Sequence, residues 1–251
     1  MVNMRREYEE AYRDYEDTHF YFLARKQLVL WLIQSFFPRN KAIQVLDLGC
    51  GTGNVLAFLA RRLKGSFTGL DSSKFMLSKH KGPKSIRLVH GDLYAPAFKP
   101  HSFDVVLSLD VLEHLKDDTG CLKSIDRMLK PGGVAILVVP AFMCLWSVHD
   151  DLNNHFRRYS WKELNEKTDL IRGNKRLFFW NAASFIPKLI ARFLFSKREL
   201  KKGSSDIEEP VYTAFPINQL VQLWLGFENI WLTHGLPLPF GSSLVVVIKK
   251  P

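Results

Sequence analysis

From Val45 onward, short apolar runs alternate with segments whose apolar residues recur at helical spacing. The runs are nearly continuous in Val, Leu and Ile, which is typical of strands buried on both faces of a parallel sheet. Between the first two runs, Val55, Leu56, Leu59 and Leu63 follow the period of an α-helix. The first five predicted strands read IQVLDLG, SFTGLD, SIRLVH, FDVVLSLD and GVAILVVP. The pattern therefore predicts an α/β fold with helices on both faces of the sheet.

The pattern is less regular after Pro140. Ser160 and Glu163 have the spacing of a capping box, which predicts a helix that begins at Trp161. The remaining pattern predicts a sixth strand, two helices and a last strand, at 175–180, 182–195, 217–231 and 242–250. Residues 197–210 have the composition of a linker. We expect a helical insertion, at about 182–235, before the last strand.

Composition narrows the cellular compartment in which we expect the protein and the partners that it could bind. The chain has 251 residues, of which 47% are hydrophobic and 24% charged, so it packs a core. Three cysteines are too few for a disulfide framework, and the charged start reads as no signal peptide, so we expect a reduced, cytoplasmic setting. The net charge of +10 favours polyanionic partners, namely nucleic acid, phosphorylated lipid or a membrane surface. A basic cytosolic protein without such a partner is the alternative.

A strand that runs into a glycine-rich turn, at 45–53, is the first candidate for chemistry. Its glycines let the backbone approach a ligand at a helix N-terminus, as many nucleotide sites do. Asp47 lies inside the strand, where a buried carboxylate needs a partner. Asp71 ends the second strand, where it can accept hydrogen bonds from both ribose hydroxyls, and Asp92 ends the third, where it can reach an adenine amino group. The pattern predicts a nucleotide-like cofactor.

The motifs DLGCGTG, GLDSS, GDL, FDVVLSLDVLEHL and LKPGGVAILVVP resemble, in order and spacing, the class I S-adenosylmethionine-dependent methyltransferases of type 11 and 12. The resemblance is strong over Val45 to Ala141. It implies a Rossmann-like, seven-stranded, mostly parallel sheet, with N-terminal helices and a helical insertion before the last strand. A nicotinamide enzyme would more usually carry its third glycine one residue later.

The resemblance also implies the cofactor and its contacts. S-adenosylmethionine would be the methyl donor and S-adenosylhomocysteine the product. Asp47 and the glycines would hold the methionine part, Asp71 the ribose, and Asp92 with Leu93 the adenine. The implied cofactor-binding residues are Arg25, Asp47, Gly49, Cys50, Gly51, Gly53, Asp71, Ser72, Asp92, Leu93 and Leu109. We expect one domain, with a helical cap at 1–40, a cofactor-binding core at 41–141 and a substrate-side region at 142–251.

The end of the fourth predicted strand restricts the acceptor. It lacks the D/N-P-P-Y/F loop of the enzymes that methylate amino groups of nucleic acid bases, which argues against that class of enzyme. Asp110, Glu113 and His114 have the spacing of one face of a helical turn. They resemble the E-x-x-E-H segment of ubiquinone-pathway and small-RNA O-methyltransferases, in which it binds a divalent metal. Because Asp110 is shorter than glutamate, we expect no metal here; a catalytic His114 and a structural role stay open.

The block at 145–160 combines histidines, arginines and acidic residues directly after the fifth predicted strand. Ligands bind beyond the carboxyl ends of strands in open α/β sheets, so this block should border the pocket. The alternative is a hydrogen-bonded loop, in which Arg157 or Arg158 pairs with Asp150 or Asp151. The catalytic or substrate-contacting candidates are His114, His149, His155, Arg158 and Asp110.

The same block, together with HFYFLAR at 19–25, resembles an uncharacterised methyltransferase subgroup that is often associated with cell-envelope polysaccharide genes. In that subgroup the upstream segment closes over the cofactor, so Arg25 would contact the cofactor carboxylate. The alternative is an aromatic helix face packed on the sheet.

We therefore expect methyl transfer to a small-molecule, glycan or lipid-linked acceptor, at an oxygen. An RNA methyltransferase and a cofactor-binding partner subunit without transfer activity are the alternatives. The apolar and basic helix at 182–195, which includes Lys188, suits peripheral contact with an anionic membrane, unless its apolar face packs on the sheet or in a dimer.

Overall fold

The computed structural model describes residues 16–194 and 216–251, except for the side chains of 191–194. A seven-stranded sheet in the order β3-β2-β1-β4-β5-β7-β6 forms its centre. Every neighbouring pair is parallel except those of β7, which runs antiparallel to both β5 and β6. The strands are β1 (Ile43–Leu48), β2 (Gly65–Asp71), β3 (Arg87–His90), β4 (Phe103–Leu109), β5 (Leu129–Pro140), β6 (Asn174–Trp180) and β7 (Ser243–Lys249). The predicted fold class is confirmed, including the reversed last strand.

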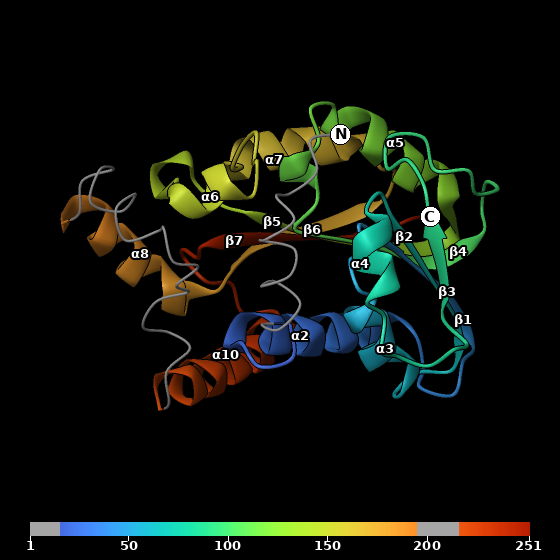
Figure 1. The fold of residues 1–251 in the computed structure, drawn as a ribbon, viewed down its shortest axis with the longest axis horizontal. Coiled ribbons are helices and arrows are strands. Elements are labelled where there is room, and N and C mark those ends of the chain that lie inside the picture. Colours follow the sequence, from blue (N-terminus) through green and yellow to red (C-terminus); the bar gives the residue numbers. More distant parts are fainter. Residues whose placement is uncertain (1–15, 195–215) are drawn as a thin grey trace.

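Helices cover both faces of this sheet (Figure 1). One face carries α2 (Phe20–Phe36), α3 (Asn54–Ala60) and α10 (Ile217–Thr233), and the other carries α5 (Asp118–Met128), α6 (Val148–Leu152) and α7 (Trp161–Lys167). The short α4 (Lys74–Ser78) follows β2, and α8 (Ala182–Leu194) follows β6. Helix α7 begins at Trp161 as predicted, because the Ser160 side chain accepts a hydrogen bond from the Glu163 N–H.

The buried residues form two apolar layers, one on each side of the sheet. Consecutive residues of a strand point to opposite faces, so Val45 joins the layer under α2 and α3, whereas Leu46 joins the layer under α5. The helices contribute fully buried side chains to the same layers, Leu28 of α2 to the first and Leu122 of α5 to the second. The continuous apolar strands of the sequence follow from this double burial.

Helices α8 and α10 form the predicted insertion between β6 and β7. Buried Asn229 of α10 donates to the Ala24 carbonyl of α2 at 2.9 Å and accepts from the Trp180 indole N–H at 2.8 Å. Asn218 accepts from the Phe20 N–H at 3.0 Å. These amide side chains tie the insertion to the N-terminal helix. The linker expected at 197–210 and the helical residues expected before Glu16 lie outside the described residues.

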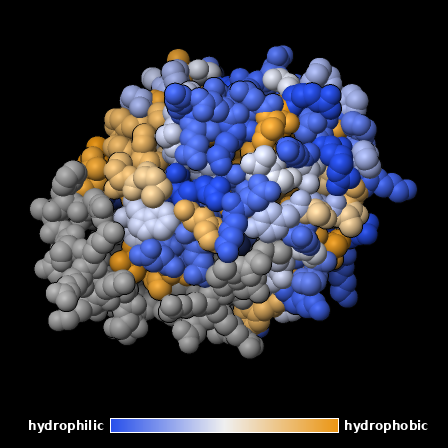
Figure 2. All heavy atoms as spheres, turned by 90° about the horizontal axis from the view of Figure 1, so that it is seen from above, coloured by the Kyte–Doolittle hydropathy of each residue, from blue (hydrophilic) through white to orange (hydrophobic). Residues whose placement is uncertain are grey.

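Several large apolar side chains of the insertion face outward. On α10 they include Leu223, Trp224 and Phe227, with Phe227 72% exposed, and on α8 they include Ile186 and Ile190. Figure 2 shows hydrophobic residues gathered toward the end of the molecule that carries α8. No helix among the described residues has the length and apolar character that a bilayer span requires.

Candidate active site

The turn between β1 and α3 brings backbone close to a ligand position. Gly49, Gly51 and Gly53 all have positive φ, at 73°, 54° and 73°, which glycine adopts without strain. A Cβ on Gly49 would lie 2.5 Å from a methyl carbon of Val111, so no larger residue fits there. A Cβ on Gly51 would meet nothing closer than 3.5 Å, so at this position the positive φ, and not a lack of space, disfavours a larger residue.

Asp71 holds this turn from the end of β2. One carboxylate oxygen accepts from the Gly51 N–H at 2.8 Å, and the other accepts from the Ser73 N–H at 2.8 Å. Burial raises the pKa of Asp71, although these backbone bonds oppose the rise. The Ser72 N–H also donates to this carboxylate. Two carboxylate oxygens have about four acceptor positions, so Asp71 can still accept from a ribose hydroxyl.

Asp47 lies in β1, two residues before the same turn. It is only 2% exposed, and burial raises its pKa to about 7, partly opposed by the charge of Arg25. A buried carboxyl with a raised pKa is suited to a ligand that carries its own ammonium group, because that charge favours the ionised form.

Glu16 is a residue of this site that the sequence patterns did not reveal. It is buried, accepts a hydrogen bond from the Thr52 hydroxyl, and would lie 3.8 Å from a Cβ on Gly51. Its backbone carbonyl accepts from the Lys26 ammonium at 2.7 Å. Only its position upstream of HFYFLAR could have indicated it, because charged residues are common throughout that segment.

The remaining cofactor candidates lie at, or just after, the carboxyl ends of β1, β2, β3 and β4. Cys50, Leu93 and Leu109 are buried, and the Cys50 sulfur would lie 2.5 Å from a Cβ on Gly69. The Ser72 carbonyl bonds the His90 ring at 3.1 Å. Asp92 is exposed and accepts from the Tyr94 N–H at 3.0 Å.

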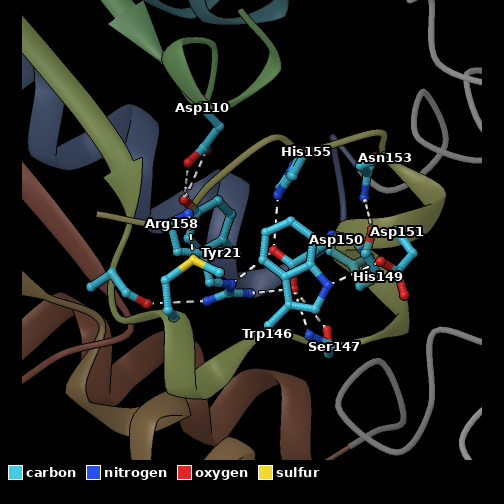
Figure 3. Close-up of polar contacts among 12 residues, drawn as sticks. Tyr21, Asp110, Trp146, Ser147, His149, Asp150, Asp151, Asn153, His155 and Arg158 are labelled. Atoms are coloured by element: carbon cyan, nitrogen blue, oxygen red, sulfur yellow. Dashed lines mark hydrogen bonds and ion pairs between the residues drawn. The ribbon is translucent and has the colours of Figure 1, made fainter. Parts of the chain in front are cut away.

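Arg25 and Asp110 pair with each other, which corrects the expected geometry of Asp110. The residue has a φ of 57°, outside any helix, so it does not share a helical face with Glu113 and His114. Its carboxylate pairs with the Arg25 guanidinium and accepts from the Tyr21 hydroxyl at 2.8 Å. Figure 3 shows Asp110 directed at Tyr21. Tyr21 and Arg25 thus link α2 to the end of β4.

Glu113, His114 and His155 come together beyond β4, and we call them the Glu113 cluster. Potential ligand atoms of the three side chains lie within 4.8 Å of one another. The rings of His114 and His155 meet edge to face, with centroids 4.5 Å apart. Burial, followed by the Asp110 charge, raises the pKa of Glu113 well above its usual range. Burial and the neighbouring His155 lower the pKa of His114 to about 3, so its imidazole is neutral.

Fully buried Asp150 of α6 organises the loop that carries His155. Its carboxylate accepts from His155 Nδ1 at 2.8 Å and from Arg158 through Nε at 2.8 Å and Nη2 at 2.9 Å. The backbone N–H and the hydroxyl of Ser147 donate to the same carboxylate. Burial alone would raise the pKa of Asp150, but the bonds from His155 and Arg158 hold it well below its usual range. Arg158 therefore pairs inside the loop, as one of the two alternatives for this block anticipates.

The last predicted candidate, His149, lies at the protein surface beside the Glu113 cluster. Its ring is exposed, with its centroid 6.5 Å from that of His155 (Figure 3). Trp146 lies near it and donates from its indole nitrogen to Asp151 at 2.9 Å. The structure thus brings His114 and His155 together, holds Arg158 behind them, and leaves His149 outside the cluster.

Residues 46–137 match the family model described as a methyltransferase domain. The chain is 38% identical over 112 residues to trans-aconitate 2-methyltransferase of Deinococcus radiodurans. The matched region covers 43% of this chain and 42% of that protein. It is 31% identical over 122 residues to demethylmenaquinone methyltransferase of Staphylococcus aureus, over 44% and 51% of the two chains. This chain therefore spans about half the length of these curated relatives.

Solved structures extend the likeness over nearly the whole fold. In the complex of the Haloferax volcanii Trm112 methyltransferase activator, the matching chain has a TM-score of 0.63 and 21% identity, over 98% of this chain and 95% of that one. Phosphoethanolamine N-methyltransferase 2 of Haemonchus contortus, with S-adenosylmethionine, has a TM-score of 0.58 and 18% identity, over 90% and 52%. These likenesses show the fold.

Replacing Asp150 tests its organising role. Asp150→Asn should lower the free energy of unfolding by about 3–5 kcal/mol, because it leaves the buried Arg158 guanidinium without its counter-charge. Exposed Asp151→Asn, one residue away, should cost under ~1 kcal/mol. Urea unfolding at pH 7 measures both.

The pH dependence adds a second check. Because the pKa of Asp150 is lowered on folding, its stabilisation is complete above the ordinary value of 3.8 and is lost as the pH falls below it. The difference between wild type and Asp150→Asn should therefore shrink in acid. Equal stabilities of the two variants at pH 7 would contradict the role of Asp150.

Proposed function

We propose that this chain, a class I S-adenosylmethionine-dependent methyltransferase by its domain and fold, transfers the methyl group to an oxygen of a small-molecule, glycan or lipid-linked acceptor. One observation carries the proposal. Asp47, the glycine turn and Asp71 lie at the carboxyl ends of β1 and β2, and Glu113 and His114 follow the carboxyl end of the neighbouring parallel strand β4, where His155 joins them. Ligands of open α/β sheets bind at this edge.

The residues of the first half fit the cofactor. Asp47 and the glycine turn would receive the methionine part, Asp71 the ribose hydroxyls, and Asp92 with Leu93 the adenine. The close approach of backbone at Gly49 and the free acceptor capacity of Asp71 support this placement. Arg25, paired with Asp110, would take the cofactor carboxylate from the α2 side, with Ser72, Cys50 and Leu109 lining the site.

S-adenosylmethionine supplies a methyl group that is already activated on a sulfonium. The chain's own residues therefore act mainly by alignment, which is worth ~7–11 kcal/mol in well-oriented reactions. A hydroxyl acceptor must also lose its proton. We assign the positioning and deprotonation of this hydroxyl to His114 and His155. Arg158 and Asp150 are positioning residues, and His149 lies at the rim of the proposed acceptor site.

The acceptor class is inferred from the surface beside the site. Ile186 and Ile190 of α8 are exposed, and α8 contacts the start of the loop after β5, at Met143–Leu145. The exposed apolar side chains of α10 lie on the other face of the sheet. An amphiphilic acceptor, or peripheral contact with a membrane in a cytoplasmic protein, would use such side chains. Phe193 and Leu194, which helical spacing places on the same face, are not among the side chains described.

Two observations favour other functions, RNA methylation and a role as a partner subunit, and each can be tested on the purified protein. The net charge of +10 favours RNA as acceptor, in which case bound nucleic acid would raise the 260/280 nm absorbance ratio of the purified protein. The fold likeness to a partner of the Trm112 activator favours a subunit role. Cofactor binding without turnover on any acceptor pool would support that role.

Asp71→Ala tests the cofactor site. The variant should weaken S-adenosylhomocysteine binding by roughly 1.5–3 kcal/mol, because it removes charge-assisted bonds to the ribose. Calorimetric titration measures the affinity. The matched control is Asp104→Ala, because Asp104 also accepts a backbone N–H, from Gln44 at 2.8 Å, but lies at the opposite edge of the sheet. Unchanged affinity in Asp71→Ala would remove Asp71 from the site.

His155→Asn tests the acceptor side. The variant should bind the cofactor normally but lose ~10²- to 10⁴-fold in kcat, because the acceptor hydroxyl is no longer prepared for attack. The control is His101→Asn, a histidine at the opposite edge whose φ of 51° asparagine also adopts. Steady-state transfer of tritiated methyl measures both. Full activity in both His155→Asn and the corresponding His114→Asn variant would leave alignment alone as the mechanism.

A further inference from the structure

We propose that a basic surface at the β3 edge of the sheet binds the phosphate backbone of nucleic acid. We use the name basic surface for the lysines and arginines of residues 61–90, which run from the end of α3 through α4 to β3. The proposal goes beyond the proposed function, because it concerns binding and holds whichever molecule accepts the methyl group.

The first observation is the uneven distribution of charge along the chain. Residues 61–90 contain eight lysines and arginines and one acid, Asp71, and so carry +7 of the chain's net charge of +10. Asp71 accepts from the Gly51 N–H in the glycine turn. From residue 72 to residue 91 the sequence has no acidic residue at all. One short stretch therefore supplies most of the excess positive charge.

The second observation is that the fold gathers these charges at one end of the sheet. β3 is an edge strand, and a Cβ on Gly82, in the loop before it, would lie 2.7 Å from the Ala57 side chain, so this loop packs on α3. Figure 1 shows α3, α4 and β3 toward the end of the molecule opposite α8. The exposed members come from neighbouring segments: Arg61, Arg62 and Lys64 after α3, Lys81 and Lys84 in the loop, and Arg87 of β3.

The third observation is that these charges are not neutralised. No lysine or arginine of residues 61–90 forms a salt bridge within the described part of the chain. By contrast, Lys175 of β6 pairs with Asp169 at 2.6 Å, and Lys250 after β7 pairs with Asp126 at 3.2 Å. Unpaired like charges repel one another, and a polyanion bound over them relieves the repulsion.

The side chains around these cations indicate the kind of partner. None of the large apolar side chains exposed on the described part of the chain lies between residues 37 and 142. Protein interfaces have an apolar core, and membrane-bound helices carry apolar side chains beside their basic ones. A phosphate backbone instead binds through cations, because its neutralisation releases condensed counterions. The composition of the basic surface therefore favours nucleic acid over a protein or a membrane.

The basic surface is also distinct from the apolar end of the molecule and from the Glu113 cluster. Exposed Ile186 and Ile190 belong to α8, which follows β6 at the opposite edge of the sheet. A flat membrane that contacts α8 would therefore not face the β3 edge. Strands β3 and β4 are three strand spacings apart, roughly 14 Å. Nucleic acid on the basic surface and a small acceptor at the Glu113 cluster would thus occupy different sites.

Fluorescence anisotropy of the full chain with a labelled, single-stranded RNA of mixed sequence tests the proposal. About six phosphate contacts should make the affinity of wild type fall roughly 300-fold between about 50 and 200 mM salt. Lys81→Glu/Lys84→Glu should weaken binding at least about tenfold at low salt and reduce the slope of log K against log salt by about 1.4, because two contacts are lost.

The matched control is Lys123→Glu/Lys162→Glu, which changes the net charge equally at exposed lysines of α5 and α7, on the other face of the sheet. It should bind RNA within about threefold of wild type, because salt screens distant charges. Circular dichroism establishes that each variant is folded.

Four results would overturn the proposal. They are no RNA binding by folded wild type at about 50 mM salt, equal affinity of Lys81→Glu/Lys84→Glu and wild type, an equal loss in the control, and binding of phosphatidylserine vesicles without binding of RNA. The last result would assign the basic surface to lipid headgroups. Methylation of RNA is a separate property, which transfer of tritiated methyl measures.

Discussion

The loop between β5 and α7 depends on one buried carboxylate, that of Asp150. It receives hydrogen bonds from His155, from Arg158 and from Ser147, and it is fully buried. A buried charge is tolerable only when it is paired and hydrogen-bonded, so the loop can fold in essentially one way around it. The Phe156 N–H then donates to the Glu113 carbonyl at 2.8 Å, which fixes the loop to the end of β4. His155 reaches Glu113 and His114 for this reason.

The end of β4 is where the two halves of the site meet. Asp110 adopts a left-handed backbone conformation, which aspartate tolerates better than most residues. It turns toward Tyr21 and Arg25 of α2, while Glu113 and His114 turn toward His155. One short segment therefore contacts α2 and also carries two of the catalytic candidates.

The periodicity of the sequence predicted the strands, and they agree with the structure because a buried strand is a local pattern. The reversed direction of β7 was implied by the family resemblance, and the structure has it. Asp110 was misplaced because spacing alone cannot reveal a residue that leaves a strand with positive φ. Asp150 and Glu16 were not among the predicted site residues, since their importance arises from contacts with His155 and Thr52 that exist only in the folded chain. The buried carboxyl of Glu113, which has no hydrogen-bond partner among the described residues, is likewise a property of packing.

Methyl transfer at the carboxyl edge of the sheet, to an oxygen of a small, glycan or lipid-linked acceptor, is the claim that unites the two halves of the site. The most direct measurement incubates the protein and tritiated S-adenosylmethionine with cell extract, then separates small molecules, lipid, glycan, RNA and protein. We expect label in the small-molecule, lipid or glycan fraction, released by cleavage of an O-methyl group and reduced with Asp71→Ala. Label confined to RNA or protein, or none at all from a chain that binds S-adenosylhomocysteine, would contradict the claim.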